Sequence, residues 1–111
     1  MNNLHLSKEA QNDLAAIKVY ITEELEKPDA ALATISRITK KIRVLKNQAY
    51  LGTPLSSVAD TESDYRFLVS GNYLVFYRAY GKDVYIDRVL YGRRDYMRIL
   101  FGDAQSDEAD E

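Results

Sequence analysis

Three runs of strand-forming residues, close together in the second half of the chain, constrain the fold most strongly. They are rich in Val, Ile, Tyr and Phe, and the tripeptides Ser-Gly-Asn at 70–72 and Gly-Lys-Asp at 81–83 separate them. Runs joined by such short segments are typical of consecutive antiparallel hairpins. The pattern predicts a three-stranded meander with strands over residues 65–70, 73–80 and 84–91. The middle run is apolar at every position from 73 to 77, as expected for a strand covered on both sides or for the centre of a sheet.

The first half of the chain predicts one short strand and two helices. Residues 2–6 alternate polar and apolar side chains, as expected for a strand at an edge or paired with the meander. Ser7 can accept a hydrogen bond from a free backbone N–H of the next turn, so a helix is expected to begin near residue 8. Apolar residues then recur at spacings of three and four, and Pro28 interrupts the series. Two helices are expected, over residues 8–26 and 29–47, joined as a hairpin.

The order of these elements is β-α-α-β-β-β. It predicts an α+β fold in which a small antiparallel sheet carries an N-terminal helical hairpin on one face. The other sheet face carries polar residues and is expected to be free for binding. Residues 93–101 are expected to form either a closing helical turn or a further short strand. With 111 residues in all, we expect one domain over residues 1–102. Residues 103–111 are small, acidic and polar, and we expect them to be disordered.

Composition and charge exclude several classes of function. The chain has no cysteine and a single histidine, His5, so no disulfide, metal site or cofactor is expected. It has no signal-peptide pattern and no run of 18 uncharged apolar residues, so a cytoplasmic protein without a membrane segment is expected. The formal net charge is −2, but five of the 17 acidic residues lie in the last nine positions. Residues 1–102 thus carry 15 basic and 12 acidic side chains, which permits a local basic patch.

Arginine is the residue type in the meander that most needs an explanation. Arg66, Arg78 and Arg88 lie within the predicted strands, and Arg93 and Arg94 follow the last strand. Closing the hairpins brings several guanidinium groups together, where they can bind phosphates or carboxylates of a partner. They can equally form internal salt bridges, because aspartates lie nearby at positions 64, 83, 87 and 95. The sequence alone leaves both interpretations open.

Three further groups of side chains have a structural interpretation beside a functional one. The nine tyrosines suit sheet packing and can also stack on nucleic-acid bases. His5 suits a surface histidine and can also act as a general base if a partner lies close. Basic residues near the end of the second predicted helix complement its dipole and can also meet phosphates. These basic residues are Lys40, Lys41, Arg43 and Lys46. In each case the structural interpretation is favoured.

Several segments of the meander resemble those of a known superfamily. The sequences YRFLV at 65–69, NYLVFYR at 72–78 and DRVLYGRRD at 87–95, together with Pro54-Leu55 and the order of elements, resemble the RelE/ParE toxins of type II toxin–antitoxin systems. The resemblance covers roughly residues 3–101, and its most specific part is RVLYGRRDY at 88–96. It implies a bacterial toxin encoded beside an antitoxin, which wraps the toxin with an extended or helical C-terminal segment. RelE-like members cut messenger RNA in the ribosomal A site without a metal, whereas ParE-like members inhibit DNA gyrase.

Within this superfamily the sequence is closer to ParE-like members. RelE-like members usually carry an arginine at the position of Leu74 and a lysine at that of Leu68. The resemblance therefore implies a ParE-like toxin, of the kind associated with plasmid stabilization, that arrests bacterial growth by inhibiting DNA gyrase and is neutralised by a cognate antitoxin. Its target-binding residues are then expected to be Arg78, Arg93, Arg94 and Arg98.

Two alternatives stay open. The first is a RelE-like nuclease that acts on messenger RNA at the ribosome, so the chain is not assigned as an enzyme or a non-enzyme. Metal-free RNA cleavage needs a base, an acid and stabilisation of charge at the phosphate, and the chain supplies arginines but no obvious acid or base. The second alternative is a non-toxic protein-binding module. The residues that the nuclease would use are Arg66, Arg88, Arg94, Tyr91 and Tyr96.

Overall fold

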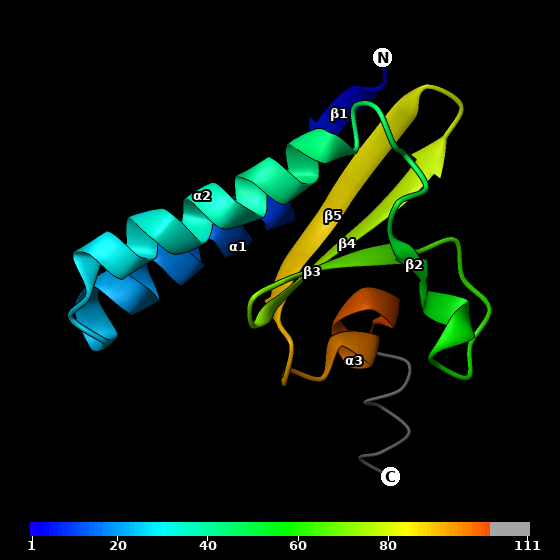
Figure 1. The fold of residues 1–111 in the computed structure, drawn as a ribbon. Coiled ribbons are helices and arrows are strands. Elements are labelled where there is room, and N and C mark those ends of the chain that lie inside the picture. Colours follow the sequence, from blue (N-terminus) through cyan, green and yellow to red (C-terminus); the bar gives the residue numbers. More distant parts are fainter. Residues whose placement is uncertain (103–111) are drawn as a thin grey trace, which may run out of the picture.

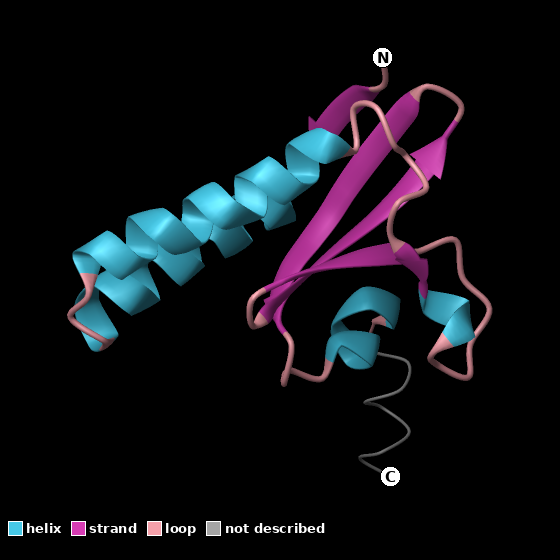
Figure 2. Ribbon diagram, viewed as in Figure 1, coloured by secondary structure: helices cyan, strands magenta, loops and turns pink. Residues whose placement is uncertain are grey.

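The computed structural model describes residues 1–102 and shows one β-sheet with helices packed on both of its faces (Figure 1). The predicted disorder of residues 103–111 concerns positions outside this range. Figure 2 shows the same view coloured by secondary structure. In chain order the elements are β1 (Asn3–Leu6), α1 (Lys8–Val19), the π-helical turn η1 (Tyr20–Glu24), α2 (Pro28–Val44), β2 (Thr53–Pro54), the 3₁₀ turn η2 (Leu55–Ser57), β3 (Arg66–Ser70), β4 (Tyr73–Tyr80), β5 (Asp83–Tyr91) and α3 (Tyr96–Phe101).

The helical hairpin begins at the predicted cap. The Ser7 hydroxyl accepts a hydrogen bond from the Ala10 N–H at 2.9 Å. It also donates to the Asp87 carbonyl at 2.7 Å, which ties the start of α1 to β5. The first helix does not run unbroken to residue 26 as predicted, because α-helical geometry ends at Val19 and the wider π turn follows it. None of the helices in residues 1–102 combines the length and apolar character needed to cross a bilayer.

The joint between the two long helices is short and lies at the end of the molecule remote from the sheet (Figure 1). Glu26 adopts a left-handed φ of 55°, and Pro28 opens α2 with a ring that suits the first helical position. The second helix ends at Val44, three residues before the predicted end. Residues 45–47 instead donate to the carbonyls three positions earlier, which closes the helix with tight turns.

The predicted meander is confirmed, and each strand end lies within one residue of the prediction. The strand order is β1-β5-β4-β3-β2, with antiparallel pairing from β5 through β4 and β3 to β2. The expected purely antiparallel sheet is wrong at one edge, because β1 pairs in parallel with β5. The connection after β1 is a helical hairpin, and such a long connection permits parallel pairing where a tight turn does not. The two-residue β2 is too short to give an alternating pattern, so it was not predicted.

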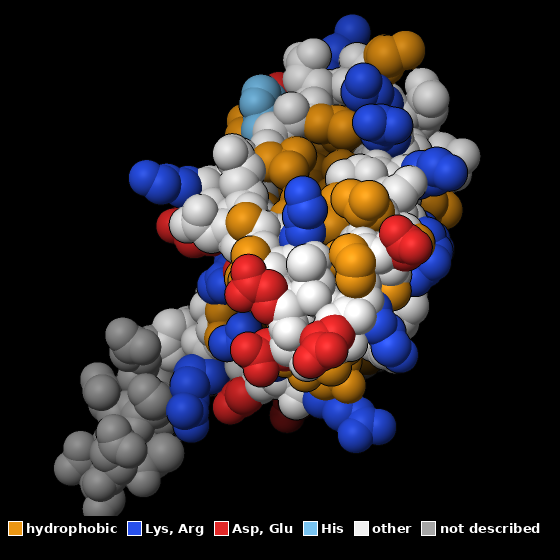
Figure 3. Space-filling model, turned by 90° about the vertical axis from the view of Figure 1, so that its left-hand side faces the viewer, with side chains coloured by type: hydrophobic (Ala, Val, Ile, Leu, Met, Phe, Trp, Pro, Cys, Tyr) orange, Lys and Arg blue, Asp and Glu red, His pale blue; other side chains and the backbone are white. Residues whose placement is uncertain are grey.

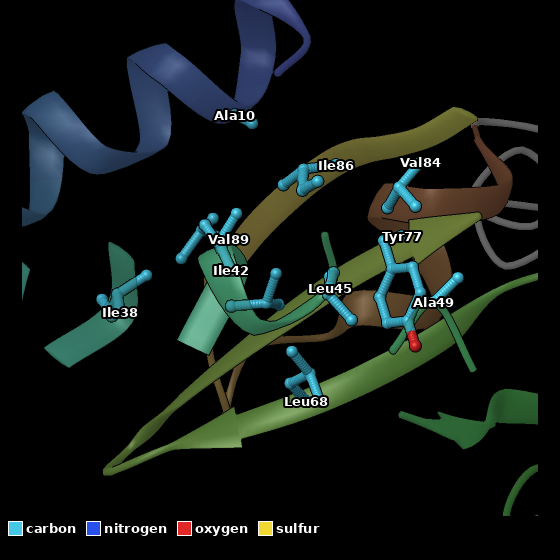
Figure 4. Close-up of a cluster of buried hydrophobic side chains, with 11 residues drawn as sticks. Ala10, Ile38, Ile42, Leu45, Ala49, Leu68, Tyr77, Val84, Ile86 and Val89 are labelled. Carbon is cyan, nitrogen blue, oxygen red and sulfur yellow. The ribbon is translucent and has the colours of Figure 1, made fainter. Parts of the chain in front are cut away.

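The main core lies between the helical hairpin and the sheet, as predicted. Figure 4 shows Ile38 and Ile42 from α2 beside Val89 and Ile86 from β5. All four side chains are at most 4% exposed. Burying an aliphatic side chain of this size stabilises the fold by about 1.5–3 kcal/mol. The α+β fold with a hairpin on one face is therefore confirmed.

The opposite sheet face is also covered, and the expectation that it would be free for binding is wrong. Leu55, Phe76 and Leu90 are at most 1% exposed on this side. The helix α3 confirms the predicted closing helical turn, and its apolar side chains pack over this second cluster. The alternating pattern of β4 sends Phe76 to one face and Tyr77 to the other, which is why both faces need an apolar cover.

Candidate binding site beside the end of β5

The end of β5 is held against the turn between β3 and β4. Gly92 follows the strand, and its N–H donates to the Asn72 carbonyl at 2.8 Å. A Cβ atom at Gly92 would lie 3.3 Å from that carbonyl oxygen, so the two backbones approach closely. The Arg94 N–H then donates to the Tyr91 carbonyl at 2.9 Å, which turns the chain away from the sheet. Tyr91 and the arginines after it are exposed as a result.

A groove lies between this strand end and the helical hairpin. Its volume is about 660 Å³, and we call it the end groove. Its walls are mainly apolar and aromatic, with Arg94 at its margin. Figure 3 looks onto the hairpin end of the molecule and shows hydrophobic side chains exposed among charged ones. The hydrophobic residues of the end groove that carry the argument are Ile17, Tyr20, Leu25, Tyr73 and Tyr91.

The aromatic side chains of the end groove come from separate elements. Tyr73 and Tyr91 meet edge to face with ring centroids 5.8 Å apart. Burial raises the pKa of Tyr73, so its hydroxyl stays protonated near neutral pH. Tyr20 is 52% exposed and Leu25 47% exposed, although Leu25 continues the apolar series of the first predicted helix. Apolar side chains left in water beside a groove are typical of a surface that binds a protein partner.

An ion pair holds Asp13, one of the residues that line the end groove. Arg88 donates to both carboxylate oxygens of Asp13, each at 2.8 Å, and the Val89 N–H donates to the same carboxylate at 2.9 Å. The hydrogen bond and charge of Asp13 raise the pKa of Arg88. The side chains are only 25% and 12% exposed, for Arg88 and Asp13 respectively. This pair joins α1 to β5, so Arg88 holds the framework of the groove together.

Arg78 is engaged in a second internal network, with Asp87 and Tyr65. Its Nε donates to Asp87 at 2.8 Å, and the Tyr65 hydroxyl donates to the same oxygen at 3.0 Å. Burial lowers the pKa of Arg78, but the hydrogen bond to Asp87, the charge of Asp87 and the contacts with Tyr80 and Tyr65 together outweigh that effect, and the net shift is upward. Burial, followed by the charge of Asp87, raises the pKa of Tyr65 to about 12. Tyr65 is therefore a hydrogen-bond donor here and a poor proton acceptor.

Two more predicted site residues have partners within their own chain. Arg66 donates to the Gly52 carbonyl at 2.8 Å, and its guanidinium lies 4.9 Å from the ring centroid of Tyr50. Tyr96 is half-buried, with its ring 5.2 Å from that of Phe76 in the second cluster. Both side chains thus stabilise the fold around the sheet.

The arginines after β5 are placed differently. Arg93 and Arg94 are exposed, and neither takes part in an ion pair among residues 1–102. Arg98 lies 3.6 Å from Asp95 one helical turn before it, in a pair that is more than half exposed. Such a surface pair contributes little to stability and leaves the guanidinium accessible. Among the arginines of the predicted site, those available to a partner are therefore Arg93, Arg94 and Arg98.

Of the predicted site residues, Tyr91 and Arg94 both line the end groove. The other predicted site residues do not line it. The aspartates at 87 and 95 do pair with arginines, as one interpretation expected. Asp13 was missed as the partner of Arg88, because it lies 75 residues away in the chain. The hairpin residues Tyr20 and Leu25 were missed too, although for Leu25 the apolar series that continues past the core was a signal. The lone His5 lies 2.9 Å from Asp83 at an exposed sheet edge.

The fold places this chain in a class of small α+β domains with a helical hairpin on one face of a five-stranded sheet. The model of one family, described as the ParE toxin of the type II toxin–antitoxin system parDE, matches residues 4–96. The chain therefore belongs to the ParE toxin family. No curated protein matches it.

Two solved structures are similar to this chain. One, described as the chromosomal ParDE toxin–antitoxin system from P. aeruginosa, is 24% identical with a TM-score of 0.67, and the match covers 82% of this chain and 96% of the other. The other is YafQ from E. coli strain BL21(DE3), which is 19% identical with a TM-score of 0.43 over 92% of this chain and 100% of the other. The similarity to the P. aeruginosa structure supports the fold described above.

Proposed function

We propose that this ParE-family toxin acts in the bacterial cytoplasm, arrests growth by inhibiting DNA gyrase, and is neutralised by an antitoxin encoded beside it. The observation that carries the proposal is the pair of exposed cations Arg93 and Arg94, next to the end groove and without an ion-pair partner in residues 1–102. Arg94 borders the groove itself. These two arginines contact the target, with Arg98 beside them.

The end groove suits the antitoxin. Antitoxins of this superfamily wrap their toxins with an extended or helical C-terminal segment, and an amphipathic segment needs an apolar groove with charged margins. Tyr20, Leu25 and Tyr91 offer such a surface, with exposed fractions of 52%, 47% and 40%. An antitoxin seated there lies against Arg94 and blocks the target-binding cations. Binding of the antitoxin in this groove would thus also block the surface that binds the target.

The RelE-like nuclease has less support. Leu74, at the position of the RelE-like arginine, packs against the second apolar cluster. Arg66 is bound to backbone carbonyls, and Arg88 is bound to Asp13. Tyr96, a predicted residue of the nuclease site, packs against Phe76 with ring centroids 5.2 Å apart.

Pulse-labelling of bacteria in the first minutes after induced expression, without antitoxin, tests the proposed target. Thymidine incorporation is expected to fall before methionine incorporation. An earlier fall in methionine incorporation would support the ribosomal nuclease instead, and unchanged growth would support a non-toxic binding module. The matched variants are R93E/R94E, which should remove the effect, and K8E/K82E, which makes the same change in net charge at exposed positions elsewhere and should keep it.

Co-expression with the product of the neighbouring gene tests the groove. The variant Y20E/L25E places two carboxylates in the apolar wall, so it should arrest growth even when the antitoxin is present. Val58→Glu, at a 60% exposed position in the loop after η2, is the control and should remain neutralised. Neutralisation of both variants would place the antitoxin elsewhere on the surface.

A further inference from the structure

The second half of α2 carries positive charge that neither the core nor the end groove uses. From residue 30 to residue 59 the chain contains no Asp or Glu. It contains five basic residues there, all of them exposed: Arg37, Lys40, Lys41, Arg43 and Lys46. None of the ion pairs found among residues 1–102 includes any of these five.

The helix directs most of these cations away from the core. Ile38 and Ile42 are buried against the sheet. With 3.6 residues per turn, Lys40 lies on the opposite side of α2 from them, and Arg37 and Arg43 lie about 60° to either side of it. Lys41 lies about 100° from Lys40, and a rise of 1.5 Å per residue spreads positions 37–43 over roughly 9 Å. Lys46 follows the end of the helix at Val44. In Figure 3, Lys and Arg side chains run down the right-hand side of the view, the side toward which α2 lies. We call residues 37, 40, 41, 43 and 46 the α2 basic face.

The helix dipole explains only part of this arrangement. A cation near the C-terminus of a helix is stabilised by the dipole, but the effect falls off within the last turn. Arg37 and Lys40 lie before the last turn of a helix that ends at Val44. The α2 basic face therefore has unpaired positive charge directed away from the body of the protein.

The charge and the residue types of the α2 basic face indicate which kind of partner it can bind. A nucleic-acid duplex presents one negative charge per about 1.7 Å of axis, so cations spread along a helix meet phosphates without a matched pattern. An acidic protein would need carboxylates in matching positions. The segment Pro28–Val44 contains no aromatic residue, so it has no platform on which the bases of a single strand could stack. We propose that the α2 basic face binds the phosphate backbone of a nucleic-acid duplex, independently of base sequence.

Fluorescence anisotropy with the full chain and a labelled 20-base-pair DNA duplex of mixed sequence tests this proposal. Binding is expected at 50 mM salt and should weaken steeply toward 200 mM, with a slope of about −0.9 for each phosphate contacted. K40E/K41E should weaken binding at 50 mM salt by about tenfold or more and reduce the slope. K8E/K82E changes the net charge equally and should stay within about threefold of the wild type.

Three outcomes would overturn the proposal. The first is no binding by the folded wild-type chain at 50 mM salt, with folding checked by circular dichroism. The second is an equal loss in K40E/K41E and K8E/K82E, which would show that only net charge matters. The third is equal affinity for a polyglutamate peptide, which would assign the surface to acidic proteins. Because binding is measured without cells, the result is independent of whether the chain arrests growth.

Discussion

The arginines within the sheet and the arginines after it have opposite surroundings. Arg66, Arg78 and Arg88 each donate to carbonyls or carboxylates of their own chain at 2.8 Å. Arg93 and Arg94, only a few residues further along, are exposed and have no ion pair among residues 1–102. The difference follows from position, because a guanidinium inside a packed sheet must be neutralised or hydrogen-bonded, whereas one at a strand end stays hydrated.

The arginines of the segment 88–96 therefore have two different structural settings. Arg88 and Arg93 belong to the same segment that carries the family resemblance, yet one joins α1 to β5 and the other is exposed without an ion pair among residues 1–102. Substitutions in the sheet should therefore lower stability, and substitutions after it should alter function at constant stability.

The largest effect on stability is expected at the Arg88 pair. Asp13→Ala leaves a mostly buried guanidinium unpaired and removes the acceptor of the Val89 N–H. It should lower the free energy of unfolding by about 3 kcal/mol. Urea unfolding followed by circular dichroism measures this. Asp60→Ala, in an exposed loop, is the matched control and should change it by less than about 0.5 kcal/mol.

A smaller loss is expected at the Arg78 network. Asp87→Asn keeps the shape of the side chain but weakens its bonds to Arg78 and Tyr65. Because Arg78 is 36% exposed, water compensates in part, and a loss of about 1.5 kcal/mol is expected by the same urea experiment. A loss as large as that of Asp13→Ala would show that the two strand arginines are equally important to the fold.

The same network makes stability depend on pH in the alkaline range. The folded chain raises the pKa of Tyr65 to about 12, so the native state keeps this proton while the unfolded state loses it near pH 10. The contribution is fully present below about pH 10 and is lost as the pH rises toward 12. Thermal unfolding of wild type and Tyr65→Phe at matched pH should show a shallower decline in the variant. Parallel declines would mean that Tyr65 titrates normally.

The smallest effect on stability is expected for R93E/R94E. Both side chains are exposed and have no ion pair in residues 1–102, so the free energy of unfolding should stay within about 0.5 kcal/mol of the wild type. Urea unfolding under the conditions used for Asp13→Ala makes the comparison direct. A loss above 2 kcal/mol would place these arginines with those of the sheet.

Local patterns in the sequence were sufficient to predict most of the fold. The Ser7 cap, the strand runs and the Gly turns act within a few residues, so the helical hairpin and the meander followed from them. The parallel pairing of β1 and the cover of the second face depend on contacts between distant segments, which periodicity does not report. For the same reason the candidate site was predicted only in part. Tyr91 and Arg94 lie at the end groove, but the opposing wall with Tyr20 and Leu25 comes from the hairpin.

The most direct test of the proposed role of Arg93 and Arg94 in target binding is growth after induction of R93E/R94E, compared with wild type and with K8E/K82E. All three must first show the same folded signal and similar urea midpoints. We expect wild type and K8E/K82E to stop growth and R93E/R94E to leave growth unchanged. An R93E/R94E chain that is equally stable and equally toxic would contradict the assignment of Arg93 and Arg94 to the target.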